Sequence, residues 1–131
     1  MKLLFTILVI SVSLLCNAQL PKLENGKLLL EKAVTFKTGS DELTDEGKEA
    51  LMPVKEFLAQ KDYITTLRVE GQIDKSVAAS AGQVLTEKRA LAVCKWLVEN
   101  GIDRKRLIAV GFGSSLLPRM IIQLIKHKIA E

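Results

Sequence analysis

Two oppositely charged residues, Asp74 and Arg89, occupy positions at which side chains commonly meet a ligand. The stretch 68–70 (RVE) alternates polar and apolar residues, which predicts a half-buried strand that ends at Gly71. Asp74 follows this strand, and Arg89 stands in the first turn of a helix predicted to begin at Thr86. A strand end and a helix start can converge in an α/β domain. Arginine grips a carboxylate through two parallel hydrogen bonds and aspartate accepts from an ammonium, so the pair suits a ligand carrying both groups.

The same two side chains have a purely structural interpretation. Asp74 and Arg89 could pair with each other or remain solvated, because surface ion pairs are common and contribute little. Residue chemistry alone favours this structural interpretation. The ligand site is favoured only by a resemblance of the surrounding motifs to a known family.

Those motifs resemble the OmpA-like peptidoglycan-binding domain family. The family's strand exit reads Gly-His-Thr-Asp and its next helix begins Leu-Ser-x-x-Arg-Ala, which correspond here to 71–74 (GQID) and 85–90 (LTEKRA). The resemblance continues from about Val34 to Pro118. It implies non-catalytic binding of diaminopimelate in the stem peptide of the cell wall, with its amino-acid end held by Asp74 and Arg89. Leu85 and Thr86 are expected to add backbone N–H groups at the helix start, where anions bind readily.

The expected fold is an OmpA-like α/β domain, a β-α-β-α-β two-layer sandwich with helices packed on a mixed sheet. Strands are predicted at 33–36, 63–69 and 106–113, and helices at about 45–60 and 86–100. The first helix is capped by Thr44 or Asp45, and Pro53 should kink or restart it. A small strand is expected at 28–30, after a turn signal at 25–26. The loop 37–40 either forms one wall of the ligand pocket or only turns the chain.

Several residues depart from the family pattern. Gln72 and Ile73 replace the motif His and Thr, and Gly82 stands where the family usually has Asn. After Pro118 the family's polar loop, helix and last strand motifs are missing, and apolar residues of the tail follow helical spacing. The final strand is therefore expected to be missing, and one hypothesis is a frameshifted, truncated gene product. The alternative function is a structural or interaction module of the same fold that has lost wall binding.

The N-terminus predicts export. Lys2, an apolar run and small residues up to Ala18 indicate a signal peptide over 1–18. A lead-in segment (19–32), the OmpA-like domain (33–118) and a divergent tail (119–131) follow. A lipidated Cys16 or an uncleaved anchor are the alternatives. The expected location is the periplasm or cell envelope, associated with the outer membrane. The expected partners are peptidoglycan and outer-membrane or other envelope proteins.

Composition argues against other functions. The net charge is +4, but basic residues are interleaved with acidic ones, so no nucleic-acid partner is expected. No nucleophile and base are arranged for catalysis, so the chain is expected not to be an enzyme and to need no metal or cofactor. Cys94 is predicted to be a small buried core residue, and His127 to be solvated.

Overall fold

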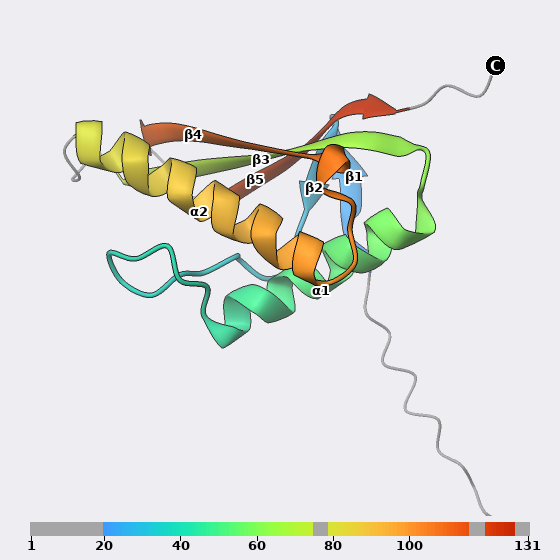
Figure 1. The fold of residues 1–131 in the computed structure, drawn as a ribbon, viewed down its shortest axis with the longest axis horizontal. Helices are drawn as coiled ribbons and strands as arrows, with labels where there is room; N and C mark the ends of the chain where they lie inside the picture. The colour runs from blue at the N-terminus through green and yellow to red at the C-terminus, as the bar shows by residue number, and fades with distance from the viewer. Residues whose placement is uncertain (1–19, 75–78, 116–119, 128–131) are drawn as a thin grey trace, which may run out of the picture.

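The computed structural model describes residues 20–74, 79–115 and 120–127, and within them five strands form one mixed sheet (Figure 1). The elements in chain order are β1 (Lys22–Glu24), β2 (Lys27–Leu29), α1 (Asp45–Gln60), β3 (Ile64–Asp74), α2 (Ala79–Glu99), the 3-10 turn η1 (Arg104–Arg106), β4 (Leu107–Ser115) and β5 (Met120–His127). Across the sheet the order is β1-β2-β5-β3-β4, with β3 and β4 parallel and the other pairs antiparallel. Both helices lie on the same side of the sheet (Figure 1). The predicted fold class is confirmed.

The first helix begins where the sequence predicts. The Thr44 side chain accepts a hydrogen bond from the Gly47 backbone N–H at 3.0 Å, which caps α1. Acidic residues in the first turn complement the positive end of the helix dipole. The apolar stripe on this helix is buried, as its spacing predicts: Gly47, Ala50, Leu51, Val54, Phe57 and Leu58. The helix runs continuously through Pro53, so the expected restart does not occur.

The strand β3 lies at the centre of the core. Leu67 and Val69 are fully buried on one face of the strand, opposite Ala90, Val93 and Leu97 of α2 in the same apolar cluster. Between helix and sheet the backbones are in direct contact at two glycines. A Cβ at Gly71 would overlap the Thr86 carbonyl, and one at Gly111 would overlap the Glu87 backbone. Because β3 and α2 touch here without side chains between them, the end of β3 and the middle of α2 are held close together.

Arg106 connects the end of α1 to β3. Its guanidinium donates to three carbonyls, each at 3.0 Å: from Nε to Ile64 and from Nη2 to Leu58 and Lys61. The last carbonyls of a helix have no partner within the helix, so a cation at this end satisfies them.

Replacing Arg106 by alanine is therefore expected to lower the free energy of unfolding by about 2 kcal/mol, since hydrogen bonds to charged groups contribute about 1.5–3 kcal/mol. The midpoint of urea denaturation measures the change. The neighbouring Lys105→Ala is the matched control, because Lys105 is exposed and should shift stability by less than about 0.5 kcal/mol. Equal shifts for both variants would contradict the proposed role.

The predicted strand at 33–36 is wrong. Only Phe36 makes a bridge, to Leu43, outside the sheet. The Thr35 carbonyl instead accepts from the Thr44 backbone N–H at 3.1 Å, and the Thr35 backbone lies against Gly47. This segment is therefore held by the first turn of α1. The predicted strand near 28–30 is confirmed as β2, joined to β1 by a turn at Asn25 and Gly26, both with positive φ.

The expectation that the final strand is missing is also wrong, because β5 runs between β2 and β3. Its apolar residues fit a helix by spacing, but positions 120, 122 and 124 also alternate as in a strand. Ile122 pairs with Val69 and is 1% exposed, and on the other face Arg68 donates to Gln123 at 2.8 Å. The frameshift hypothesis concerns the gene. Translating its DNA sequence in the other two reading frames tests the hypothesis.

Two element bounds differ near the motif residues. The strand β3 continues through Gly71 to Asp74, with a register shift between Gly71 and Ile73. The helix α2 begins at Ala79 and not at Thr86. Its early turns are fixed by β4, because Gln83 Nε2 donates to the Gly111 carbonyl at 2.6 Å. The stop after 99 is as predicted, with Gly101 at φ 99° and the Ile102 N–H donating to the Leu97 carbonyl at 3.0 Å.

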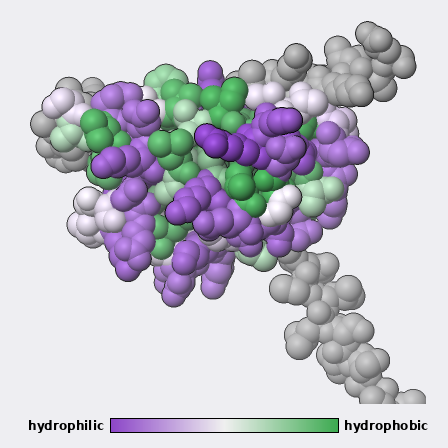
Figure 2. All heavy atoms as spheres, in the orientation of Figure 1, coloured by the Kyte–Doolittle hydropathy of each residue, from purple (hydrophilic) through white to green (hydrophobic). Residues whose placement is uncertain are grey.

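The surface carries small apolar areas among polar ones. Figure 2 shows apolar side chains at several separate places on the face seen in Figure 1, with polar residues between them. Within the part of the chain that the structure describes, no helix is long and apolar enough to cross a membrane. The predicted signal peptide over 1–18 and Cys16 lie outside the described residues.

Candidate functional site

Asp74 is the last residue of β3, at the strand exit predicted from the sequence. Its backbone pairs with Ser115 at the end of the parallel strand β4. Ligands of α/β sheets gather outside the carboxyl ends of parallel strands, so this edge is the expected side for a site. The Asp74 side chain lies outside what the structure describes. Its neighbour Ile73 is described and is 8% exposed.

Arg89 lies on the side of α2 that faces the loop after Phe36. Its Nε donates to the Ser40 carbonyl at 2.8 Å, and its Cζ lies 5.0 Å from the centroid of the Phe36 ring. Nη1 and Nη2 meet no hydrogen-bond acceptor among the groups that the structure describes. Burial lowers the pKa of the guanidinium, and nearby Asp41 opposes that shift. Arginine begins from so high a pKa that the group stays charged at neutral pH.

A cavity of about 850 Å³ joins three segments of the chain: the loop after Phe36, the end of β3 and the early turns of α2. Its lining residues are Thr38, Gly39, Ile73, Ser80, Ala81, Val84, Leu85, Lys88 and Arg89. The loop after Phe36 contributes Thr38 and Gly39 to this lining, and its role as a wall of the ligand pocket stays a prediction. Arg89 and Ile73, the residue before Asp74, therefore line the same cavity.

Leu85 and Thr86, the two residues predicted to supply backbone N–H groups, do not lie at the start of the helix. Because α2 starts at Ala79, Leu85 and Thr86 lie inside the helix, where backbone N–H groups serve the helix's own hydrogen bonds. Leu85 lines the cavity with its side chain. Thr86 is fully buried, and its hydroxyl donates to the Gln83 carbonyl and accepts from the Gly113 N–H at 2.9 Å. The prediction of an anion site at their backbone is wrong.

Sequence reasoning assigned no role to Lys88, which also lines the cavity. The signal was present, since Lys88 adjoins Arg89 in the motif, but nothing local says that both residues border one cavity. Of the departures from the family pattern, Ile73 belongs to the lining, whereas Gln72 and Gly82 do not.

The described residues give little support to a reactive thiol or to a metal site. Burial raises the pKa of the Cys94 thiol to about 11, so this cysteine stays protonated and unreactive at neutral pH. Among the described side chains no group of three or more His, Cys, Asp or Glu gathers as metal ligands would.

A mixed sheet with two helices on one face defines an α/β domain, and a cavity lies at the exit of its strand β3. The chain belongs to the OmpA family, whose model matches residues 35–119.

Several solved structures share the fold. An outer membrane protein from Borrelia burgdorferi B31 aligns with a TM-score of 0.66 and 18% identity, covering 81% of this chain and 96% of that one. The peptidoglycan-associated lipoprotein from Burkholderia pseudomallei has a TM-score of 0.60 and 20% identity, covering 72% and 89%. The C-terminal domain of Helicobacter pylori MotB has a TM-score of 0.60 and 17% identity, covering 69% and 81%. At these identities the likeness concerns the fold.

Proposed function

We propose that this domain binds peptidoglycan without catalysis, by holding the amino-acid end of diaminopimelate between the Asp74 carboxylate and the Arg89 guanidinium. The observation that carries the proposal is that Arg89 and Ile73, the residue before Asp74, line one cavity. The family membership and the peptidoglycan-associated lipoprotein of the same fold agree with it.

The cavity suits the rest of that amino acid. Diaminopimelate has an aliphatic spacer between its two amino-acid ends, and Ile73, Val84 and Leu85 offer an apolar wall for it. Nη1 and Nη2 of Arg89 are the nitrogens that form a bidentate pair with a carboxylate. Lys88 adds a second cation, which favours a ligand with a further carboxylate. A place in the cell envelope, next to the wall and in contact with outer-membrane proteins, follows from this role.

Asp74→Asn tests the ammonium half of the site. The amide keeps the size of the side chain but removes its charge, so binding to purified cell wall should fall at least tenfold, about 1.4 kcal/mol. Co-sedimentation with wall fragments measures it, with free diaminopimelate as competitor. Asp62→Asn is the matched control, because Asp62 is exposed in the turn before β3 and should pellet as the unchanged protein does. Undiminished pelleting of the Asp74 variant would refute the site.

One observation favours the alternative of an interaction module without wall binding. Ile73 places a buried apolar side chain in the lining where the family has a threonine hydroxyl. A folded native protein that never pellets with cell wall would support this alternative and overturn the proposal.

A further inference from the structure

The two edges of the sheet differ in length and in charge. At one edge β1 is three residues long and carries Lys22 and Glu24. At the other edge β4 is nine residues long, and its sequence (LIAVGFGSS) contains no charged residue and no proline. Edge strands are usually short, charged or interrupted by proline, because an open row of backbone N–H and C=O groups can pair with another chain. No described strand pairs with the outer side of β4, so a further strand can be added there.

Apolar side chains stand exposed along β4. Ile108 is 44% exposed and Phe112 is 50% exposed. Val110 is half-buried and shares a face of the strand with Ile108, because alternate residues of a strand point to the same side. On the opposite face Leu107 and Ala109 pack against the core. A strand added at this edge would remove the exposed apolar side chains from water, which stabilises the complex.

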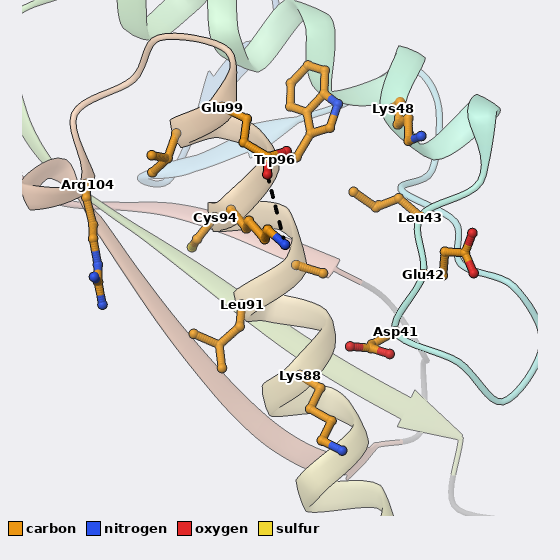
Figure 3. A pocket seen from close by; sticks show the side chains of 13 residues that line it. Asp41, Glu42, Leu43, Lys48, Lys88, Leu91, Cys94, Trp96, Glu99 and Arg104 are labelled. Atoms are coloured by element: carbon orange, nitrogen blue, oxygen red, sulfur yellow. Dashed lines mark ion pairs between the residues drawn. The ribbon is translucent and has the colours of Figure 1, made fainter.

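The edge of β4 is covered at one end and open at the other. Gln83 of α2 donates from Nε2 to the Gly111 carbonyl at 2.6 Å, and the backbone of Glu87 lies against Gly111. In the view onto the outer face of α2, β4 is clear of the helix beside Arg104 (Figure 3). The open part of the edge is therefore 107–110. An added strand has to bring its own bulk to this open end and leave room at the covered one.

We infer that β4 binds β4 of a second copy of this chain, antiparallel, about a two-fold axis through Ala109. This register sets Ile108 opposite Val110 of the second copy, and Leu107 opposite its Gly111. Each covered end then lies against the open end of the other copy. Apolar cross-strand pairs of this kind stabilise a sheet. Because the same surface is used on both copies, the assembly closes at two chains.

The charges at the two ends of the edge support the antiparallel orientation. Glu87 is exposed beside Gly111, and Arg104 is exposed on the side of α2 away from Asp41 (Figure 3). Arg104 precedes Leu107 by three residues of a 3-10 turn, a rise of about 6 Å. Neither Glu87 nor Arg104 forms an ion pair with a described residue. Antiparallel pairing brings Arg104 of each copy toward Glu87 of the other, whereas parallel pairing would bring like charges together.

This surface is separate from the proposed diaminopimelate site. No residue of β4 lines that cavity, and neither Glu87 nor Arg104 does. Pairing through β4 therefore neither requires wall binding nor blocks it.

Sedimentation equilibrium of the purified protein between about 1 µM and about 1 mM tests the pairing. The average mass should rise from one chain toward two, with a midpoint at about 100 µM, because one short edge forms a small interface. Ile108→Lys should raise the dissociation constant at least about tenfold, since a lysine on an edge strand opposes an added strand. The matched control is Met52→Lys on α1, where Met52 is 42% exposed, and it should leave dimerisation unchanged. Thermal unfolding confirms that both variants are folded.

An exchange of charges tests the orientation. Glu87→Arg and Arg104→Glu should each weaken the dimer about fivefold, and the two changes together should restore it to within about twofold. Glu46→Arg, at an exposed position in the first turn of α1, is the matched control for a single charge reversal and should have no effect.

Three results would overturn the pairing as drawn. A protein that remains monomeric up to about 1 mM has no such edge contact. A dimer that Ile108→Lys leaves intact forms through another surface. A dimer that Ile108→Lys disrupts, but that the exchanged charges at positions 87 and 104 fail to restore, excludes the antiparallel register about Ala109.

Discussion

Replacing Arg89 by alanine is expected to abolish co-sedimentation with cell wall, with affinity reduced about 100-fold. The guanidinium would supply two charge-assisted hydrogen bonds to the ligand carboxylate, and their loss costs about 3 kcal/mol. The same side chain holds the loop after Phe36 through its bond to the Ser40 carbonyl. Ligand contact and loop position are therefore lost together. Sedimentation at graded wall concentrations measures the affinity, and thermal unfolding confirms that the variant is folded.

Two further variants separate these contributions. Phe36→Leu removes the ring under the guanidinium but keeps Arg89, so only a few-fold loss is expected, since an exposed cation–π contact contributes about 0.5–1 kcal/mol. Arg89→Lys keeps the charge without the planar donor pair and should bind at an intermediate level. If Phe36→Leu weakens binding as much as Arg89→Ala, then Arg89 acts through the loop and the proposed ligand contact is wrong.

The pH dependence of this contact follows from the direction of the pKa shift. Burial lowers the pKa of Arg89, so in principle its charge could be lost sooner as pH rises. Because the ordinary pKa of arginine is above about 12, the guanidinium remains protonated throughout the neutral range. Wall binding through Arg89 should therefore stay constant between about pH 6 and pH 9. A decline within that window would point to another group.

The sequence predicts the position of Asp74 better than that of Arg89, which is expected in the first turn of its helix but lies in the middle of α2. Asp74 stands at a strand exit because the alternating pattern before it is local and clear. The start of α2 was misplaced because it depends on distant contacts, from Gln83 to Gly111 and from Thr86 to Gly113. Local helix signals at Thr86 carry no information about β4. The N–H groups assigned to Leu85 and Thr86 were wrong for this reason.

The C-terminal segment that forms β5 shows the same limit of prediction from local sequence. Apolar residues spaced for a helix also alternate over 120–124, and a short apolar segment cannot be assigned by periodicity alone. What selects the strand is pairing on both sides, with β2 and with β3. By contrast, the sequence narrows the cap of α1 to Thr44 or Asp45, and the structure has Thr44. The end of α2 near residue 100 is also predicted, because a helix stop depends on chemistry within a few residues.

Gly71→Ala is expected to lower the free energy of unfolding by about 3 kcal/mol, the upper end of the usual cost of overpacking. A Cβ at Gly71 would meet the carbonyl oxygen, carbonyl carbon and Cα of Thr86. These are backbone atoms in the middle of a helix, so no side chain can turn aside. The helix α2 must move away from β3, at the expense of the core contacts of Ala90, Val93 and Leu97. Urea denaturation measures the loss.

The matched control is Gly39→Ala. A Cβ at Gly39 meets no atom within 4 Å, and its φ of 65° makes the substitution cost about 1 kcal/mol through the backbone alone. Because the contact at Gly71 also fixes the distance between the end of β3 and Arg89, the variant should lose wall binding even under conditions where it remains folded. A Gly71→Ala protein that is no less stable than the Gly39 variant would mean that the helix and the strand are not in backbone contact. The positioning of the candidate site by that contact would then be wrong as well.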